Sequence, residues 1–181
     1  MSELFSIQLQ NRQQQGRDGV WLDLPTTTEQ VQAALRQIGI SSDNPQGLFI
    51  SGYFAEVEKR FAIPYNMVLA SNVDELNFLA ARLETLSAGE RAELNAALQA
   101  PQSELFSIGR ITDFPENVDY YVHLPDVRGP AQLGDYYLNR SGMVDMPEEW
   151  KGGIDTAQFG RYVAQQEQGV FTEYGYLVKS G

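Results

Sequence analysis

Short runs of alternating apolar and polar residues at the start of the chain predict β-strands. Residues 4–9 and 20–24 show this alternation, and the stretch between them, residues 11–19, is polar, with a run of glutamines and two glycines. Such a stretch is typical of an exposed hairpin connection. The chain is therefore predicted to begin with two neighbouring strands.

The pattern then changes to helical spacing before it returns to a strand. A helix is predicted to begin at Thr28-Glu29 and to end at Gly39. Its apolar residues recur three and four positions apart: Val31, Ala34, Leu35 and Ile38. Residues 47–55 again fit a strand. We therefore predict a small α+β domain over residues 1–62.

Two amphipathic helices are predicted in the middle of the chain. The first follows Ser71 or Asn72, either of which suits a helix N-cap. Its apolar stripe consists of Leu76, Leu79, Ala80, Leu83 and Leu86. The second follows Ser87, because Ser87 and Glu90 have the spacing of a capping box. Its buried face is predicted to consist of Leu94, Ala97 and Leu98. Residues 63–110 are therefore predicted to form a helical domain.

Short helices and strands alternate with glycine- and proline-rich loops in the last third of the chain. Helices are predicted over residues 131–139 and 157–165, and a final pair of strands near residues 170–171 and 176–178. Residues 111–181 are therefore predicted to form a second α+β domain. The expected fold is α+β and elongated, with a helical section between two α+β units.

The charge balance limits the partners of this chain. Its 181 residues carry 24 acidic and 13 basic side chains, a formal net charge of −11, without an acidic tail. Such a charge opposes binding to nucleic acid and to anionic membranes, and it favours a basic partner. The absence of cysteine excludes disulfides, zinc–thiolate sites and thiol nucleophiles. The sequence has neither an apolar run of the ~20 residues that span a bilayer nor a secretory signal, so a cytoplasmic location is expected.

Short motifs follow one another along the chain and are informative as a set. Three lie in the last third: Leu133-Gly134-Asp135-Tyr136-Tyr137, Ile154-Asp155 ahead of Phe159-Gly160-Arg161, and Gly169-Val170-Phe171-Thr172 ahead of Gly175-Tyr176. Others lie upstream: Trp21-Leu22-Asp23-Leu24-Pro25, Leu76-Asn77-Phe78-Leu79-Ala80 and Asn117-Val118-Asp119-Tyr120. In this order and spacing they resemble the ArdA family of antirestriction proteins, over most of the chain.

The resemblance implies a decoy and not an enzyme. Members of the ArdA family are acidic DNA mimics that inhibit type I restriction-modification enzymes. The expected partner is therefore the DNA-binding groove of the specificity and methyltransferase subunits of such an enzyme. The resemblance also implies a homodimer joined through the C-terminal part. No cofactor and no metal are expected, because the sequence has no phosphate-binding glycine loop and no calcium-loop pattern.

A decoy of this kind needs carboxylates spread over a folded surface, because duplex DNA carries one charge per ~1.7 Å of its axis. The acidic residues predicted to imitate phosphates are Asp74, Glu75, Glu84, Glu90, Glu93, Asp113, Glu116, Asp119, Asp126, Asp135, Asp145, Glu148, Glu149 and Asp155. Those near helix N-termini also suit the helix dipole, and simple solvation of the surface accounts for the same pattern. A stabilising role and a phosphate-mimicking role are compatible.

A different class of function, an acidic adaptor for another basic protein, follows from the tyrosines. They are dense at residues 120–121, 136–137 and 174–176. Tyrosine is enriched at interfaces, where its ring packs and its hydroxyl stays hydrogen-bonded. Core packing is nevertheless the expected role of each tyrosine taken by itself.

A carboxylate-dependent hydrolase is a more remote alternative. It would need a pair of acidic groups, for which Glu148 with Glu149 or Asp126 with Asp135 are the candidates. Nothing in the sequence distinguishes these from solvated surface. His123, the one histidine, alternates with apolar neighbours and is expected to be a partly buried, hydrogen-bonded structural residue.

The hexapeptide Ser-Glu-Leu-Phe-Ser-Ile occurs twice, as residues 2–7 and 103–108. An old duplication and a chance match between a strand and a helix both account for it. Chance is preferred, because the similarity soon drifts and repeat proteins show three or more periods.

Overall fold

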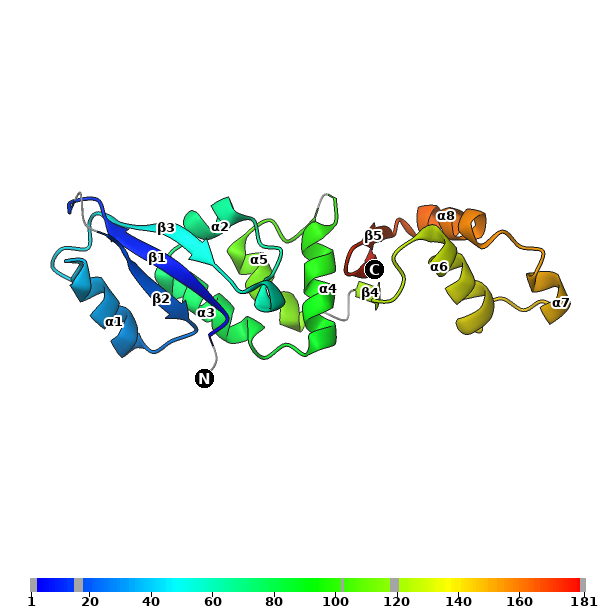
Figure 1. The fold of residues 1–181 in the computed structure, drawn as a ribbon, viewed down its shortest axis with the longest axis horizontal. Coiled ribbons are helices and arrows are strands. Elements are labelled where there is room, and N and C mark those ends of the chain that lie inside the picture. Colours follow the sequence, from blue (N-terminus) through cyan, green and yellow to red (C-terminus); the bar gives the residue numbers. More distant parts are fainter. Residues whose placement is uncertain (1–2, 15–17, 102, 118–120, 180–181) are drawn as a thin grey trace. The chain divides into compact units, whose positions relative to one another are not determined.

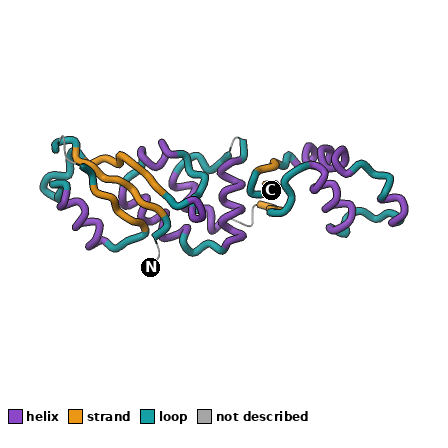
Figure 2. Tube along the Cα trace, in the orientation of Figure 1, coloured by secondary structure: helices purple, strands orange, loops and turns teal. Residues whose placement is uncertain are grey.

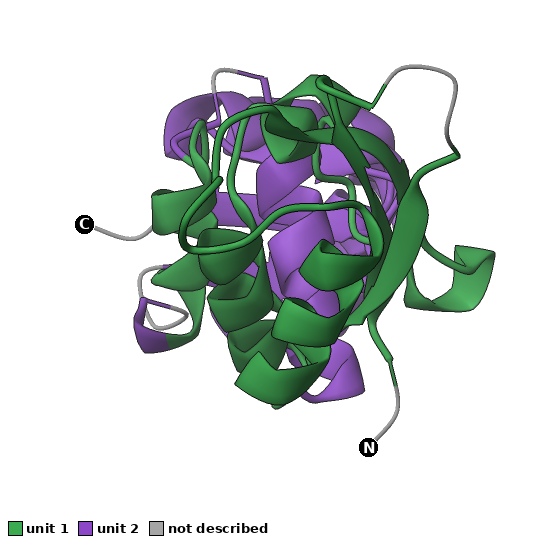
Figure 3. Cartoon of the chain, turned by 90° about the vertical axis from the view of Figure 1, so that its left-hand side faces the viewer, with its two compact units in different colours: residues 1–86, 105–115 green, residues 87–104, 116–181 purple. Residues whose placement is uncertain are grey.

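A computed structural model describes residues 3–14, 18–101, 103–117 and 121–179. It contains helices and two small antiparallel sheets (Figure 1, Figure 2), which confirms the predicted α+β class. The chain divides into two compact units (Figure 3). Unit 1 consists of Met1–Leu86 and Leu105–Pro115, and unit 2 of Ser87–Glu104 and Glu116–Gly181. The division into three domains stays a prediction.

A three-stranded antiparallel sheet organises unit 1. The central strand is β1 (Phe5–Asn11), which pairs with β2 (Val20–Leu24) on one side and β3 (Leu48–Phe54) on the other. All three strands were predicted, over residues 4–9, 20–24 and 47–55. Residues 15–17 of the predicted hairpin connection lie outside the described residues.

Helices pack on the sheet of unit 1. α1 (Thr28–Gln37) is followed by Gly39, whose φ of +77° favours glycine, as the predicted helix end requires. α3 (Val73–Leu83) begins at Asn72, whose side chain accepts a hydrogen bond from the first turn, so Asn72 and not Ser71 is the cap. The remaining elements of this region are η1 (Val57–Lys59), α2 (Tyr65–Leu69), α5 (Ile108–Thr112) and η2 (Phe114–Glu116).

The core of unit 1 lies between one face of the sheet and the helices. Ile7, Leu9 and Leu24 point into it from β1 and β2 and are completely buried. The predicted apolar stripe of α3 is confirmed: its residues Leu76, Leu79, Ala80 and Leu83, and Leu86 beyond its end, are all buried. Because side chains alternate along a strand, this packing leaves the other face of the sheet to solvent.

Unit 2 begins with α4 (Ala88–Gln99) and its predicted capping box. The backbone N–H of Glu90 donates to Ser87 Oγ at 3.2 Å, and the backbone N–H of Ser87 donates to Glu90 Oε1 at 3.0 Å. The predicted buried face is wrong at Leu98, which is half-buried, whereas Asn95 is buried. The small side chains of this helix give a weak pattern, and the packed neighbours decide where the buried face is centred.

The second antiparallel sheet has the strand order β4-β6-β5. β4 spans Tyr121–Leu124, β5 spans Val170–Thr172 and β6 spans Gly175–Lys179. The pairing of β5 with β6 confirms the predicted final pair of strands. β4 joins them from an earlier part of unit 2 and carries His123.

Helices complete unit 2. α6 (Pro130–Asp135) continues into a π-helical turn (Tyr136–Arg140), and the two together occupy the helix predicted over residues 131–139. α7 (Glu148–Lys151) is short, and α8 (Thr156–Glu167) includes the second predicted helix. Their core cluster consists of Val127, Leu133, Ala164 and Tyr176.

The two copies of the repeated hexapeptide differ in structure. The first copy leads into β1, whereas in the second Ser107 caps α5 by accepting a hydrogen bond from the backbone N–H of Arg110 at 3.2 Å. Phe-Ser-Ile thus begins a strand at residues 5–7, whereas at residues 106–108 the same three residues form the start of a helix. The surroundings decide between them, as tertiary context commonly overrides local preference.

Candidate partner-binding surface

The predicted phosphate-mimicking carboxylates reach solvent on both units. In unit 1 they are Asp74, Glu75, Glu84 and Asp113. In unit 2 they are Glu90, Glu93, Glu116, Asp126, Asp135, Asp145, Glu148, Glu149 and Asp155. Glu75, Glu90 and Glu93 are half-buried, and the others are exposed. Asp119 lies outside the described residues.

Several of these carboxylates stabilise helix starts. Asp155 is the N-cap of α8 and accepts hydrogen bonds from the backbone N–H groups of Ala157 at 3.0 Å and Gln158 at 3.2 Å. In the capping box of α4, hydrogen bonds from the backbone and side chain of Ser87 lower the pKa of Glu90. Both caps hold a carboxylate in a fixed position at the start of a helix.

Other predicted carboxylates are partly neutralised by nearby cations. Asp135 lies 3.9 Å from the guanidinium of Arg140 and accepts a hydrogen bond from the Asn139 side chain at 2.8 Å. Glu148 forms an ion pair with Lys151 at 2.9 Å. The Asp135–Arg140 pair is exposed on both sides and contributes little stability, whereas the Lys151 side chain is only 14% exposed and Glu148 is the exposed member of its pair.

The remaining carboxylates are the most available to a partner. Within the described ranges, no hydrogen bond or ion pair engages the carboxylates of Asp74, Glu84, Asp126, Asp145 and Glu149, all of which are exposed. Glu93, Asp113 and Glu116 do interact with other groups of the protein. The freely solvated groups thus occur in both units, more of them in unit 2.

The charge of the two units differs in the same direction. Unit 2 has 13 acidic and 6 basic residues, a formal net charge of −7, and unit 1 has 11 acidic and 7 basic residues, a formal net charge of −4. Unit 2 is therefore the more strongly anionic, although it is the shorter of the two. At the same distance from each unit, the electrostatic attraction on a basic partner would be stronger toward unit 2 than toward unit 1.

Two glycines of the C-terminal motifs hold helices of unit 2 close together. A Cβ on Gly160 of α8 would lie 1.7 Å from the carbonyl oxygen of Pro130, at the start of α6. A Cβ on Gly134 of α6 would lie 1.9 Å from the carbonyl oxygen of Thr156, at the start of α8. Only glycine fits either position, because real side chains do not approach backbone so closely. Both glycines are buried, so these two motif positions serve the scaffold of unit 2.

A carboxylate that the sequence analysis missed, Glu167, ties this scaffold to the second sheet. Tyr137 donates its hydroxyl hydrogen bond to Glu167 Oε1, and Tyr176 donates to Oε2 at 2.6 Å. Burial, followed by these hydrogen bonds, raises the pKa of both tyrosines. No local pattern reveals this role, since the three residues meet only in the folded chain. The motif tyrosine Tyr176 is a core residue, as expected.

The residues considered as candidates for catalysis include His123 and the carboxylate pair Asp126 and Asp135. His123 is half-buried, and its Nε2 lies 2.8 Å from the carbonyl oxygen of Tyr174, which agrees with a hydrogen-bonded structural histidine. Asp126 and Asp135 border one open depression on unit 2, together with Arg140. The guanidinium of Arg140 in the same depression pairs with Asp135 at 3.9 Å.

In the part of the chain that the structure describes, no three His, Asp or Glu side chains gather in a way that would hold a metal ion. None of the described helices combines the length and the apolar character needed to cross a membrane.

A comparison with protein families agrees with this arrangement of motifs. The model of a family described as antirestriction protein (ArdA) matches residues 15–178, which include β2, all of α3 and almost all of unit 2. No curated protein matches the chain. The match covers far more than half of the sequence and includes the glycines that build the α6–α8 contact. The chain therefore belongs to the ArdA family of antirestriction proteins.

Proposed function

We propose that this protein is an acidic DNA mimic that occupies the DNA-binding groove of a type I restriction-modification enzyme and blocks it competitively. The observation that carries the proposal is the placement of exposed carboxylates on folded elements of both units, in a chain of net charge −11 that belongs to an antirestriction family. Carboxylates fixed on helices meet the lysines and arginines that otherwise hold phosphates.

The proposed mechanism needs no catalytic step. Phosphate contacts supply most of the affinity of DNA-binding proteins and carry no sequence information, so a backbone mimic blocks enzymes whatever their recognition sequence. If half of the 24 acidic residues in each of two chains face the enzyme, their number equals the phosphate charge of roughly 40 Å of duplex.

A homodimer joined through unit 2 and a cytoplasmic location are parts of the same proposal. The large apolar side chains that unit 2 exposes support self-association: Val122, Met143, Trp150, Ile154 and Tyr162. A second chain would cover some of these side chains and double the number of carboxylates offered to the enzyme.

The test is a DNA-competition assay with the purified methyltransferase core of a type I enzyme. We expect the full-length protein to displace labelled DNA, and the displacement to weaken steeply between about 50 and 200 mM salt, as for a binder that replaces several phosphate contacts. Failure to displace DNA, or displacement that barely responds to salt, would contradict the mimic and favour an acidic adaptor with a different partner.

A further inference from the structure

The solvent side of the sheet in unit 1 has an unusual combination of side chains. We call it the outer face; it consists of Ser6, Gln8, Trp21, Asp23, Gly52 and Phe54. The opposite side carries the buried core, on which α1, α2 and α3 pack. Among the described residues, no helix covers the outer face, on which Trp21 and Phe54 are exposed.

Two large aromatic side chains lie open on this face. Trp21 is 50% exposed and Phe54 is 56% exposed. Trp21 on β2 lies opposite Gln8 on β1, which lies opposite Gly52 on β3. A Cβ on Gly52 would be 3.1 Å from Trp21 Cη2, so the indole reaches across the central strand toward β3. Gly52 leaves the space that the ring occupies, and the ring remains open to a partner.

Several carboxylates lie near the end of the sheet at which β1 begins and β3 ends. Asp23 accepts a hydrogen bond from Ser6 Oγ at 2.6 Å. A hydrogen bond with Asp23, and then the charge of Asp23, raise the pKa of Glu3, and Glu56 adds to the repulsion. The ionised form of Glu3 is therefore disfavoured beside these like charges, and a cation bound there would relieve the repulsion.

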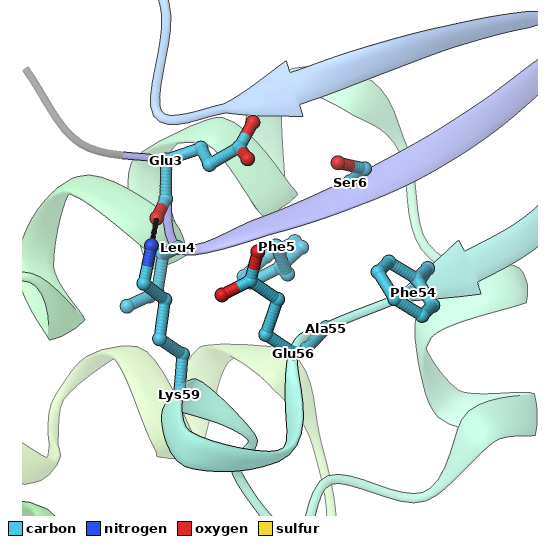
Figure 4. A pocket seen from close by; sticks show the side chains of 8 residues that line it. All are labelled: Glu3, Leu4, Phe5, Ser6, Phe54, Ala55, Glu56 and Lys59. Atoms are coloured by element: carbon cyan, nitrogen blue, oxygen red, sulfur yellow. Dashed lines mark hydrogen bonds between the residues drawn. The ribbon is translucent and has the colours of Figure 1, made fainter.

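One lysine partly offsets this charge. Glu3, Glu56, Phe54 and Lys59 border a small pocket of about 40 Å³ (Figure 4). The ammonium group of Lys59 donates to the backbone carbonyl oxygen of Glu3 at 3.3 Å, as the dashed line in Figure 4 shows. With Asp23, the site has three carboxylates for one ammonium group, and the excess negative charge lies beside exposed aromatic rings.

From this juxtaposition we infer that the outer face is a docking surface for an arginine-bearing segment of a basic protein partner. A guanidinium group forms paired hydrogen bonds with carboxylates and stacks on an indole, and Asp23 and Trp21 offer both on neighbouring positions of one strand. This inference rests on the proposed function, because the partner is the enzyme whose cationic groove the protein occupies. The aromatic contact is one that a DNA backbone lacks, so the surface adds affinity that imitation of phosphates does not supply.

The test compares variants of the full chain in the DNA-competition assay. Trp21→Ala removes the ring, and the double variant Glu3→Gln/Asp23→Asn removes two charges while the amide oxygen introduced at position 23 still accepts the hydrogen bond from Ser6. We expect each to weaken displacement of DNA from the methyltransferase core about tenfold. The matched control Glu29→Gln/Asp43→Asn removes two exposed charges from α1 and the turn after it, away from the outer face, and we expect less than about a twofold change.

A second measurement separates contact from misfolding. Trp21 and Trp150 are the two tryptophans, so 5-fluorotryptophan labelling gives one 19F signal for each, assigned with Trp150→Phe. Adding unlabelled methyltransferase core is expected to shift the Trp21 signal and to remove its response to exchange of H₂O for D₂O. One outcome would contradict the docking surface alone: the wild-type protein displaces DNA, the variants at positions 3, 21 and 23 displace it as well as the control does, and the Trp21 signal still responds to D₂O. The proposal that the protein is a DNA mimic would then remain. If the wild-type protein displaces no DNA, both proposals fall.

Discussion

Unit 1 and unit 2 are stabilised in different ways. Among the described residues, 25 buried hydrophobic residues belong to unit 1 and 9 to unit 2. Unit 1 has a conventional core in which a sheet face meets the stripe of α3. Unit 2 has the larger net charge and relies more on close backbone contact at Gly134 and Gly160 and on the Tyr137–Glu167–Tyr176 hydrogen bonds.

The difference teaches how a strongly anionic surface is kept folded. Repulsion between carboxylates destabilises the compact state, and a small core offsets less of that repulsion than a large one. Contacts that are specific in geometry, such as a glycine-mediated helix crossing and a shared carboxylate acceptor, fix positions without needing much apolar area. Such contacts therefore hold the charged surface of unit 2 in place.

The largest effect is expected from Gly160→Ala. The added methyl group would lie 1.7 Å from the Pro130 carbonyl oxygen, so α6 and α8 must separate, at a cost of about 3 kcal/mol. Urea unfolding followed by the fluorescence of Trp150, in a Trp21→Phe background, reports on unit 2. Gly152→Ala is the control, because nothing lies within 4 Å of its added Cβ and little change is expected. If the two variants were equally stable, the close approach of α6 and α8 would not require glycine at position 160.

The second prediction concerns Glu167→Gln, expected to destabilise unit 2 by about 2 kcal/mol. An amide has one acceptor oxygen and no charge, so one of the two tyrosine hydroxyls loses its acceptor and faces the amide N–H₂ group, and the other loses a charge-assisted hydrogen bond. Unit 1, monitored by Trp21 in a Trp150→Phe background, is expected to keep its urea midpoint. An equal loss of stability in both units would show that they unfold together, so that unit 1 and unit 2 would not be stabilised separately.

The same variant alters the response to alkaline pH. The pKa values of Tyr137 and Tyr176 are raised above their usual 10.0 by burial and by Glu167. A raised pKa keeps the phenol protonated in the folded state, so the contribution is complete below pH 10 and is lost as the pH rises above it. Glu167→Gln is expected to reduce this loss in unit 2. In unit 1, burial raises the pKa of Tyr53 to about 12, and the variant leaves that alkaline loss unchanged.

A smaller effect is expected on binding. Neutralising two freely solvated carboxylates of unit 2, in Asp126→Asn/Glu149→Gln, should weaken displacement of DNA from the methyltransferase core by about tenfold at low salt, and less as salt rises. The equivalent pair in unit 1, Asp74→Asn/Glu84→Gln, is expected to lose less, because unit 2 carries more of the net charge. Equal losses would assign the two units equal shares of the decoy surface.

The smallest effect is expected from the helix caps. Ser87→Ala in unit 2 and Asn72→Ala in unit 1 each remove one N-cap, at a cost of about 1 kcal/mol in urea unfolding. The pKa of Glu90 is lowered by its hydrogen bonds with Ser87, so the contribution of the capping box is present above the usual carboxyl pKa and is lost as the pH falls below it. Ser87→Ala is therefore expected to flatten the acid limb of the stability curve of unit 2, whereas Asn72→Ala leaves that limb unchanged.

The sequence by itself determined the parts of this protein that depend on neighbours along the chain. Strand patterns predicted β1 to β3 and the final strand pair, helical spacing predicted the stripe of α3, and the Ser87–Glu90 spacing predicted a capping box. These features require only residues a few positions apart, so local order is sufficient. The ordered set of motifs also identified the family before any contact was known.

Tertiary structure alone decided what distant segments do together. It showed that Gly134 and Gly160 serve a helix crossing, that Glu167 joins two tyrosines, and that Trp21 reaches across the sheet toward Gly52. The physical reason is that each of these features depends on the distance between residues far apart in the chain. Composition records how many carboxylates a chain has, whereas packing fixes which of them stand free, which cap a helix and which meet a cation.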